Sequence, residues 1–251
     1  MSQTAAVVLA AGAGRRLGSA TGKAFVPVDG KPMVAWSLHA FDASPDVDRM
    51  LLVVPPAERA RGQALLTTLR LRKPWTVVPG GEARHDSEFN ALEALAPEII
   101  EASVSRVLVH DAARPFIDLI LVRRLLETLA DHPGAIPALP ATAMLVSGST
   151  DGLLRDVMHG AWAVQTPQAF QAGPLLEAHR KARADGFRGS DTASVLERTG
   201  QTVAVLEGNL DTFKITTPVD LLRAQVIARR RQSPPEDSSS PRAGEGRVGG
   251  V

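Results

Sequence analysis

Short apolar runs recur along the chain, and stretches with helical spacing separate them. The first run, Thr4–Ala11, is followed by Gly12, Gly14 and Gly18, which is typical of a buried strand that opens into a glycine-rich loop. Further strands are predicted at Met50–Val54, Thr76–Val78, Val107–Val109, Ala135–Leu139 and Thr202–Leu206. Because strands that are buried on both faces read as continuous apolar runs, the pattern predicts a mostly parallel sheet covered by helices on both sides.

Helical spacing is clearest in three of the intervening stretches. Ala57–Leu71 is one, and Leu119, Val122, Leu126 and Leu129 mark a second. A third helix is expected after Asp191, which has the residue type of an N-cap. Strands that alternate with helices at this spacing indicate βαβ units and the α/β fold class.

Two regions depart from this alternation. Residues Pro140–Val164 lack clear helical spacing, and we expect them to form a β-arm that projects from the sheet. In the last 20 residues, Gln232–Val251, 11 are Ser, Pro or Gly, a composition that cannot bury enough apolar surface to offset the entropy of ordering. We therefore predict one domain over residues 1–231 and a disordered tail or linker over 232–251.

Composition and charge restrict the function classes. Apolar residues make up 44% of the 251 positions, charged residues 22%, and the formal net charge is +1, so we expect neither a nucleic-acid nor a membrane partner. No apolar run reaches the length of a membrane helix, and the N-terminus has no basic region typical of a signal peptide, which makes the cytoplasm the default location. Cysteine is absent, so we expect no disulfide, no thiolate metal site and no structural zinc site.

The first candidate for chemistry is the loop from Leu9 to Gly18, which reads LAAGAGRRLG. Small residues after a buried strand let backbone N–H groups approach an anion, and Arg15, Arg16 and Lys23 add positive charge nearby. A tight turn with solvated arginines remains an alternative, as does a dinucleotide-binding loop. The dinucleotide interpretation is the weaker one, because the second predicted strand runs into Pro55 without an acidic residue at its end.

Two further motifs follow predicted strands. PGGEARHDS, from Pro79 to Ser87, suits backbone recognition of a base or a phosphate, although without the other motifs a plain strand-to-helix turn is the favoured interpretation. In VLVHDAARP, Asp111 comes just past a buried strand, at the ligand edge of an open α/β sheet. Its carboxylate suits Mg²⁺ bound to nucleotide phosphates, and Arg114 suits a phosphate; the structural alternative makes Asp111 a helix cap and pairs Arg114 with an acid.

The last two motifs lie in the second half of the chain. Asp211 and Lys214 follow the final predicted strand and precede a helix that Pro218 can start. Taken alone, such a pair is most often a surface ion pair. Gln165–Gln168 reads QTPQ and is interpreted as a structural turn.

Together these motifs closely resemble the 2-C-methyl-D-erythritol 4-phosphate cytidylyltransferase family over about Ala5–Ala228. The resemblance rests, in order, on LAAGAGRR with Lys23, GGEARHDS, HDAARP, QTPQAF, SDTAS and LEGNLDTFKITTPVDL. It implies a three-layer α/β/α sandwich with the Rossmann-like nucleotidyltransferase fold and a protruding β-arm used in homodimerisation. It also implies a reaction in which a phosphate oxygen of methylerythritol phosphate attacks the α-phosphorus of CTP and pyrophosphate leaves.

The resemblance carries roles to individual positions. Arg16 and Lys23 match transition-state stabilisers, and Lys214 matches a residue near the reacting phosphate. Positions around CTP correspond to Ala10, Ala11, Gly12, Gly14, Gly81, Glu82, Ser87 and Ala112. The second substrate corresponds to Asp111, Arg114, Thr142, Ser190 and Lys214, and Asp111 also corresponds to the Mg²⁺ ligand.

The chain departs from the family pattern at three places. Gly22 and Ala24 flank Lys23 where the family usually has Pro and Gln, and Ala141 stands where an Asp commonly precedes the threonine. Met158 occupies the position of a substrate-positioning arginine, and a methionine side chain cannot bind phosphate. Arg155 lies three residues upstream and would substitute if the arm shifts.

Three other functions compete with the cytidylyltransferase. A ribitol-phosphate or other polyol-phosphate cytidylyltransferase would share the loops, and a catalytically weak nucleotide-binding protein would explain Met158. A dinucleotide oxidoreductase is the most distant alternative. Some members of the family carry a cyclase domain downstream, and the composition of residues 232–251 resembles the linker that precedes it.

Overall fold

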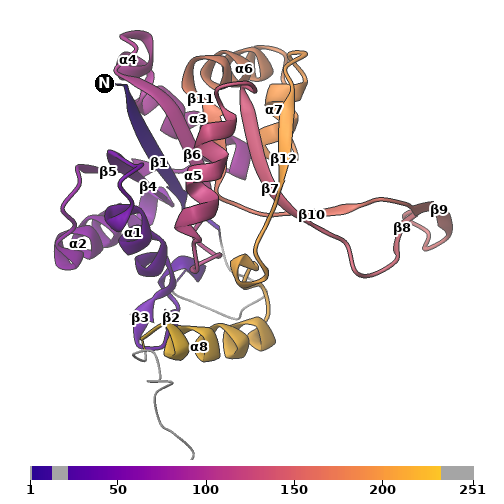
Figure 1. The fold of residues 1–251 in the computed structure, drawn as a ribbon, viewed down its shortest axis with the longest axis horizontal. Coiled ribbons are helices and arrows are strands. Elements are labelled where there is room, and N and C mark those ends of the chain that lie inside the picture. The colour runs from indigo at the N-terminus through magenta and orange to yellow at the C-terminus, as the bar shows by residue number, and fades with distance from the viewer. Residues whose placement is uncertain (1, 13–21, 233–251) are drawn as a thin grey trace, which may run out of the picture.

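The structure is a computed structural model that describes residues 2–12 and 22–232. Its centre is an eight-stranded sheet in which β1, the first strand of the chain, lies between β4 and β6 (Figure 1). The strand order is β10-β7-β11-β6-β1-β4-β5, and β12 also pairs with β7. The strands are β1 (Gln3–Leu9), β4 (Arg49–Val54), β5 (Trp75–Pro79), β6 (Val104–Asp111), β7 (Gly134–Pro140), β10 (Trp162–Val164), β11 (Gln168–Gln171) and β12 (Val203–Glu207).

Most neighbouring strands run parallel. β1 pairs in parallel with β4 and β6, β4 with β5, and β7 with β12. The four-residue strand β11 is antiparallel to both β6 and β7, and β10 is antiparallel to β7. The predicted parallel sheet is therefore correct for most pairs, with two short antiparallel strands inserted.

Helices cover both faces of the sheet because successive side chains of a strand point to opposite faces. In β1, Ala5, Val7 and Leu9 belong to one apolar cluster, and Ala6 and Val8 belong to another. The first cluster is shared with α3 (Arg84–Ala94), α4 (Ala96–Ile100), α6 (Ala172–Ala184) and α7 (Thr192–Glu197). The second is shared with α1 (Met33–Ala43), α2 (Arg59–Leu69) and α5 (Leu119–Thr128). The predicted three-layer α/β/α sandwich is confirmed.

A third apolar cluster lies below the sheet in Figure 1. Here α8 (Pro218–Gln232) packs on the two-residue strand β2 (Pro27–Val28), which pairs with β3 (Lys31–Pro32), and Phe116 and Ile215 are buried in the same cluster. The predicted helix start at Pro218 is confirmed. None of the helices in the described part is both long and apolar enough to cross a membrane.

The predicted arm is a hairpin that stands clear of the sandwich (Figure 1). Its strands are β8 (Leu145–Gly148) and β9 (Leu154–Met158), which pair with each other in antiparallel register. Several of its apolar side chains are exposed, including Met144, Val146, Leu153, Leu154 and Met158. The hairpin thus presents apolar surface that the other described residues do not cover.

One local prediction is confirmed and another is corrected. Asp191 caps α7, where its side chain accepts from the Ser194 amide at 3.0 Å. Asp111 differs slightly from its prediction, because it is the last residue of β6 rather than a residue beyond the strand. It is not a helix cap either, since Asp118 caps α5.

Candidate functional site

Three loops meet at the carboxyl-terminal edge of the sheet. The register pairs Leu9 with Asp111 on one side and with Val53 on the other, so the ends of β1, β4 and β6 lie level. Backbone hydrogen bonds continue this alignment beyond the strands, from the Ala112 amide to the Leu9 carbonyl at 3.0 Å and from the Gly80 amide to the Val54 carbonyl at 2.7 Å. The first, second and third sequence motifs are thereby placed side by side, as an open α/β sheet requires of a ligand site.

Gly80 and Gly81 allow the second loop to approach its neighbours. A Cβ atom on Gly80 would lie 2.7 Å from the Cβ of Ala11, and one on Gly81 would lie 2.3 Å from the Cβ of Asp86. Both separations are too short for any side chain, so the spacing of this loop depends on glycine. The Ser87 hydroxyl then fixes the turn, because it accepts from the Gly81 amide at 3.1 Å and donates to the Ala83 carbonyl at 3.0 Å.

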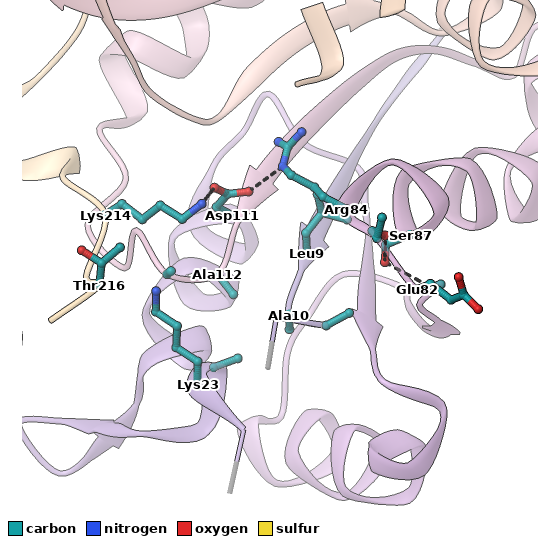
Figure 2. Close-up of a pocket in the computed structure, with 16 residues that line it drawn as sticks. Leu9, Ala10, Lys23, Glu82, Arg84, Ser87, Asp111, Ala112, Lys214 and Thr216 are labelled. Atoms are coloured by element: carbon teal, nitrogen blue, oxygen red, sulfur yellow. Dashed lines mark hydrogen bonds and ion pairs between the residues drawn. The ribbon is translucent and has the colours of Figure 1, made fainter. Parts of the chain in front are cut away.

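The loops enclose a cavity of about 410 Å³ (Figure 2), a volume in the usual range for a small-molecule site. Ten predicted site residues line it: Ala10, Ala11, Gly12, Lys23, Gly81, Glu82, Ser87, Asp111, Ala112 and Lys214. The sequence prediction did not include Leu9, Ala24, Ala83, Arg84, Ala113 and Thr216, which also line it. The cavity therefore joins residues from both ends of the described chain.

Asp111 holds two cations at one end of the cavity. Its Oδ2 accepts from Lys214 Nζ at 2.6 Å and its Oδ1 accepts from Arg84 Nε at 3.1 Å (Figure 2). Burial raises the pKa of the Asp111 carboxyl, but Arg84 and Lys214 outweigh this effect and hold its pKa well below the usual range. Asp111 is consequently a carboxylate at any physiological pH.

A buried histidine supports the backbone around Asp111. His110 Nε2 lies 3.0 Å from the Arg114 carbonyl, which can only accept, so Nε2 carries the proton and Nδ1 is an acceptor. Nδ1 accepts a hydrogen bond from the Thr166 hydroxyl at 3.1 Å, and Thr166 Oγ1 accepts one from the Asp111 amide at 3.0 Å. Burial lowers the pKa of His110 to about 3, which keeps this neutral arrangement in place. The segment predicted as a structural turn thus supplies a side chain that fixes Asp111.

Arg84 is the most consequential residue that the sequence analysis missed. It begins α3, and besides Asp111 its guanidinium contacts the Glu88 carboxylate and Thr192 Oγ1, the latter at 3.2 Å. Thr192 Oγ1 also donates to Glu88 at 2.8 Å. The arginine stood inside the quoted motif GGEARHDS, but only the adjacency of β1 and β6 reveals that it faces Asp111.

Three predicted residues of the second-substrate side do not line the cavity. The Arg114 guanidinium donates to the carbonyls of Thr212 at 2.8 Å and Val164 at 3.0 Å, and among the described residues it forms no ion pair with an acid. Thr142 and Ser190 are exposed in loops outside the cavity lining. Gly14 and Arg16 lie outside the described residues.

The pairing of β8 with β9 shows how Arg155 and Met158 lie in the arm. Met158 pairs with Leu145, whereas Ser147 pairs with Asp156 and Gly148 with Leu154, so Arg155 is the extra residue of a β-bulge. Both side chains are exposed. Alternate residues of a strand face opposite sides, so Arg155 and Met158 would face opposite sides in a regular strand. The bulge at Arg155 interrupts this alternation.

The cavity combines features that suit a phosphorylated ligand. Backbone and small side chains form one wall, and Lys23 and Lys214 extend toward the cavity from different elements (Figure 2). The Asp111 carboxylate is a hard oxygen donor of the kind that Mg²⁺ prefers. This arrangement can neutralise a polyanion while leaving room for a flat ring against the glycine loops.

Comparison with known proteins agrees with this chemistry. The family model for 2-C-methyl-D-erythritol 4-phosphate cytidylyltransferase matches residues 4–230. The enzyme of that name from Geobacillus kaustophilus is 38% identical over 91% of this chain and 98% of its own. The "Bifunctional enzyme IspD/IspF" of Rhodospirillum rubrum is 38% identical over 91% of this chain and 58% of its own. The crystal structure of the cytidylyltransferase from Thermus thermophilus superposes with a TM-score of 0.69 at 35% identity, over 89% of this chain and 98% of the other.

Proposed function

The chain belongs to the 2-C-methyl-D-erythritol 4-phosphate cytidylyltransferase family, and from this premise we propose how its own residues carry out the transfer. The enzyme converts 2-C-methyl-D-erythritol 4-phosphate and CTP to 4-diphosphocytidyl-2-C-methyl-D-erythritol and pyrophosphate in the non-mevalonate isoprenoid pathway. The observation that carries the proposal is the Arg84–Asp111–Lys214 arrangement beside the glycine loops, all in one cavity.

The nucleotide occupies the wall made by the first two loops. Ala10, Gly81 and the turn fixed by Ser87 are small enough to admit a pyrimidine, and a purine would crowd them. Backbone carbonyls facing the exocyclic amine would distinguish cytosine from uracil. The N–H group of Gly12 would meet the phosphates, as in other loops that follow a buried strand.

The reaction brings two polyanions together, so positioning and charge neutralisation dominate its cost. Lys23 and Lys214 stabilise the charge that builds on the α-phosphate as the attacking oxygen arrives. Asp111 holds the Lys214 ammonium in a fixed position before the substrates bind, which avoids reorganisation during the reaction. Arg16 belongs to the same proposal through the family resemblance.

Asp111 would also hold Mg²⁺. Each carboxylate oxygen has a second lone pair beyond the one used by Arg84 or Lys214, so the residue fits a hard cation without losing either partner. When bound, Mg²⁺ neutralises the nucleotide phosphates and polarises the phosphorus under attack.

The second substrate approaches from the arm side, where Arg114, Thr142 and Ser190 are the proposed contacts. Exposed apolar residues of the arm support a homodimer in which each arm packs on the other subunit, because a two-fold exchange of arms covers both apolar surfaces. We locate the activity in the cytoplasm, with small molecules rather than nucleic acid or membranes as partners, in keeping with the near-neutral charge.

Pyrophosphate release tests the proposal. The purified chain is mixed with Mg²⁺, CTP or ATP, and either methylerythritol phosphate or ribitol 5-phosphate. We expect release only with CTP and methylerythritol phosphate, and loss of release in EDTA. A preference for ribitol 5-phosphate would make that compound the second substrate. Equal rates with ATP would contradict a pocket that admits only a pyrimidine, and full activity in EDTA would contradict the role proposed for Mg²⁺.

A further inference from the structure

A second cluster of ionisable side chains lies between α3 and α6, away from the cavity. His85 and Glu88 are three residues apart on α3 and therefore share one face of that helix, and His179 meets them from α6. The exposed fractions are 7% for His85, 2% for Glu88 and 0% for His179. The reaction described above uses none of the three directly.

Buried nitrogen atoms in this cluster lack hydrogen-bond partners. Both ring nitrogens of His179 and Nδ1 of His85 are enclosed and have no hydrogen-bond partner among the described residues. An unpaired buried polar atom costs about 1–3 kcal/mol, so three of them in one place require an explanation. An ion bound between the two residues gives a partner to one nitrogen of each ring, and so to two of these three atoms, since imidazole nitrogens are good ligands for transition metals.

The spacing of the cluster fits a metal ion. Glu88 Oε2 lies 3.4 Å from His179 Nε2 without forming a hydrogen bond, and one ligand atom from each of the three residues lies within 4.8 Å of the others. Two ligands about 2.05 Å from a tetrahedral ion are roughly 3.3 Å apart. The His85 and His179 rings are stacked with centroids 4.8 Å apart and planes 22° apart. Because an imidazole binds a metal in its ring plane, both rings must rotate out of this stack to complete the set.

The remaining carboxylate oxygen is fixed by other groups. Glu88 Oε1 accepts from Arg84 and from Thr192 Oγ1, the latter at 2.8 Å, which leaves Oε2 facing the histidines. Hydrogen bonds of this kind orient the ligands of natural metal sites. The Arg84 guanidinium lies on the far side of the carboxylate from the histidines, where it offsets the charge of Glu88 and Asp111.

We propose that His85, Glu88 and His179 bind one divalent transition metal of the zinc class, with a water as the fourth ligand. Two imidazoles and one carboxylate suit Zn²⁺ or Co²⁺, whereas Mg²⁺ prefers an all-oxygen set. The site is distinct from the Mg²⁺ position at Asp111 and joins α3 to α6 behind Arg84. Its stabilising effect does not depend on the cytidylyl transfer.

Cobalt titration of the full chain tests the site. The protein carries no histidine tag, is first freed of metal with a chelator, and is kept in excess Mg²⁺ so that oxygen sites are occupied. We expect one Co²⁺ per chain with the visible absorption of a four-coordinate ion, displaced by Zn²⁺. Free Zn²⁺ at 100 times its Kd should raise Tm by roughly 5–10 °C.

His179→Phe retains a stacked ring but removes both nitrogens, and it should lose the cobalt absorption and the rise in Tm. His85→Gln serves as a second variant should His179→Phe fail to fold, as judged by circular dichroism. His39→Phe alters an exposed histidine and should behave like the unmodified chain. Absence of the absorption in the unmodified chain, or its retention in a folded His179→Phe or His85→Gln variant, overturns the proposal, whatever the result of the pyrophosphate assay.

Discussion

Lys23 and Lys214 reach the cavity from different elements, and their substitution should have different kinetic effects. Lys23→Ala should lower kcat about 10²–10³-fold with little change in KM for CTP, because the interaction forms mainly in the transition state. Lys214→Ala should lower kcat and also raise KM for methylerythritol phosphate, since its ammonium stands beside Asp111 on the second-substrate side. Steady-state kinetics measures both, with the exposed Lys181→Ala as control. A change confined to KM for CTP in Lys23→Ala would make Lys23 a ground-state binder.

Arg84 acts through Asp111, and the shape of its guanidinium matters as well as its charge. Nε contacts Asp111 while Nη1 contacts Glu88 and Thr192, a fork that one ammonium cannot reproduce. Arg84→Lys should keep the fold but lower kcat roughly 10²-fold through misplacement of the carboxylate. Arg84→Ala should also lower the free energy of unfolding by about 3–5 kcal/mol, because buried Glu88 loses its partner.

Kinetics and urea unfolding of the two variants separate these effects. Arg123→Lys is the matched control, since Arg123 pairs with Asp46 on the surface. Wild-type kcat in Arg84→Lys would show that charge alone is sufficient at this position.

His110 should make stability depend on pH in mild acid. Its folded pKa of about 3 lies below the ordinary value of 6.5, so between these limits the unfolded chain binds the extra proton. The contribution is complete above pH 6.5 and declines as pH falls toward 3, at up to about 1.4 kcal/mol per pH unit. Urea unfolding between pH 4 and 7 measures the slope, to which His85 also contributes because burial lowers its pKa.

His110→Gln removes the titrating ring and should have a lower free energy of unfolding at pH 7 with a shallower slope. The exposed His39→Gln should keep the slope of the unmodified chain. An unchanged slope in His110→Gln would assign the pH dependence to other groups.

Among the elements, the β8–β9 hairpin should control assembly. Leu154→Glu places a charge on an exposed apolar position of the arm and should convert a dimer to a folded monomer. Sedimentation at several concentrations measures the change, and Ile120→Glu, at an exposed apolar position outside the arm, is the control. A monomer at full activity in the unmodified chain would contradict the proposed dimer.

The elements that the sequence predicted are those whose burial is local in origin. Continuous apolar runs gave the central parallel strands, although β6 extends to Val104 through the polar Ser105 and Arg106. β11 was missed because its four residues are buried by pairing with β6 and β7 rather than by their own pattern. The sequence analysis also missed α1, because polar positions such as Asp42 interrupt its apolar pattern. Asp42 is buried and accepts hydrogen bonds from Arg72.

For the molecule as a whole, the catalytic unit should end with α8. Truncation after Gln232 should leave kcat within about two-fold, because Gly, Ser and Pro dominate the composition that follows. Truncation before Pro218 should instead unfold the chain, since Ala224, Ile227 and Ala228 complete an apolar cluster. Activity and circular dichroism measure both, and a large loss in the first variant with an intact fold would give the tail a catalytic role.

The site could be predicted only in part, because some of its contacts depend on how the whole chain folds. Glycines and residues such as Asp111 identify, in the sequence, the loops that follow strands, and these residues line the cavity as expected. Side-chain contacts across the sheet cannot be identified in this way, because they depend on strand order. Arg84 donates to Asp111, and Arg114 donates to a backbone carbonyl. The cluster at His179 likewise joins that residue to two others that lie 91 and 94 positions earlier, which no local pattern indicates.

The ion pair between Asp111 and Lys214 joins positions 103 residues apart, and this separation has a consequence for synthesis of the chain. At about 5–20 residues per second, a ribosome adds Lys214 roughly 5–20 s after Asp111. During that interval the nascent chain can already form the β1–β4–β6 layers and bring Arg84 to Asp111. The nascent chain still lacks the second cation that pairs with Asp111, so we expect little turnover of CTP before Lys214 has been added.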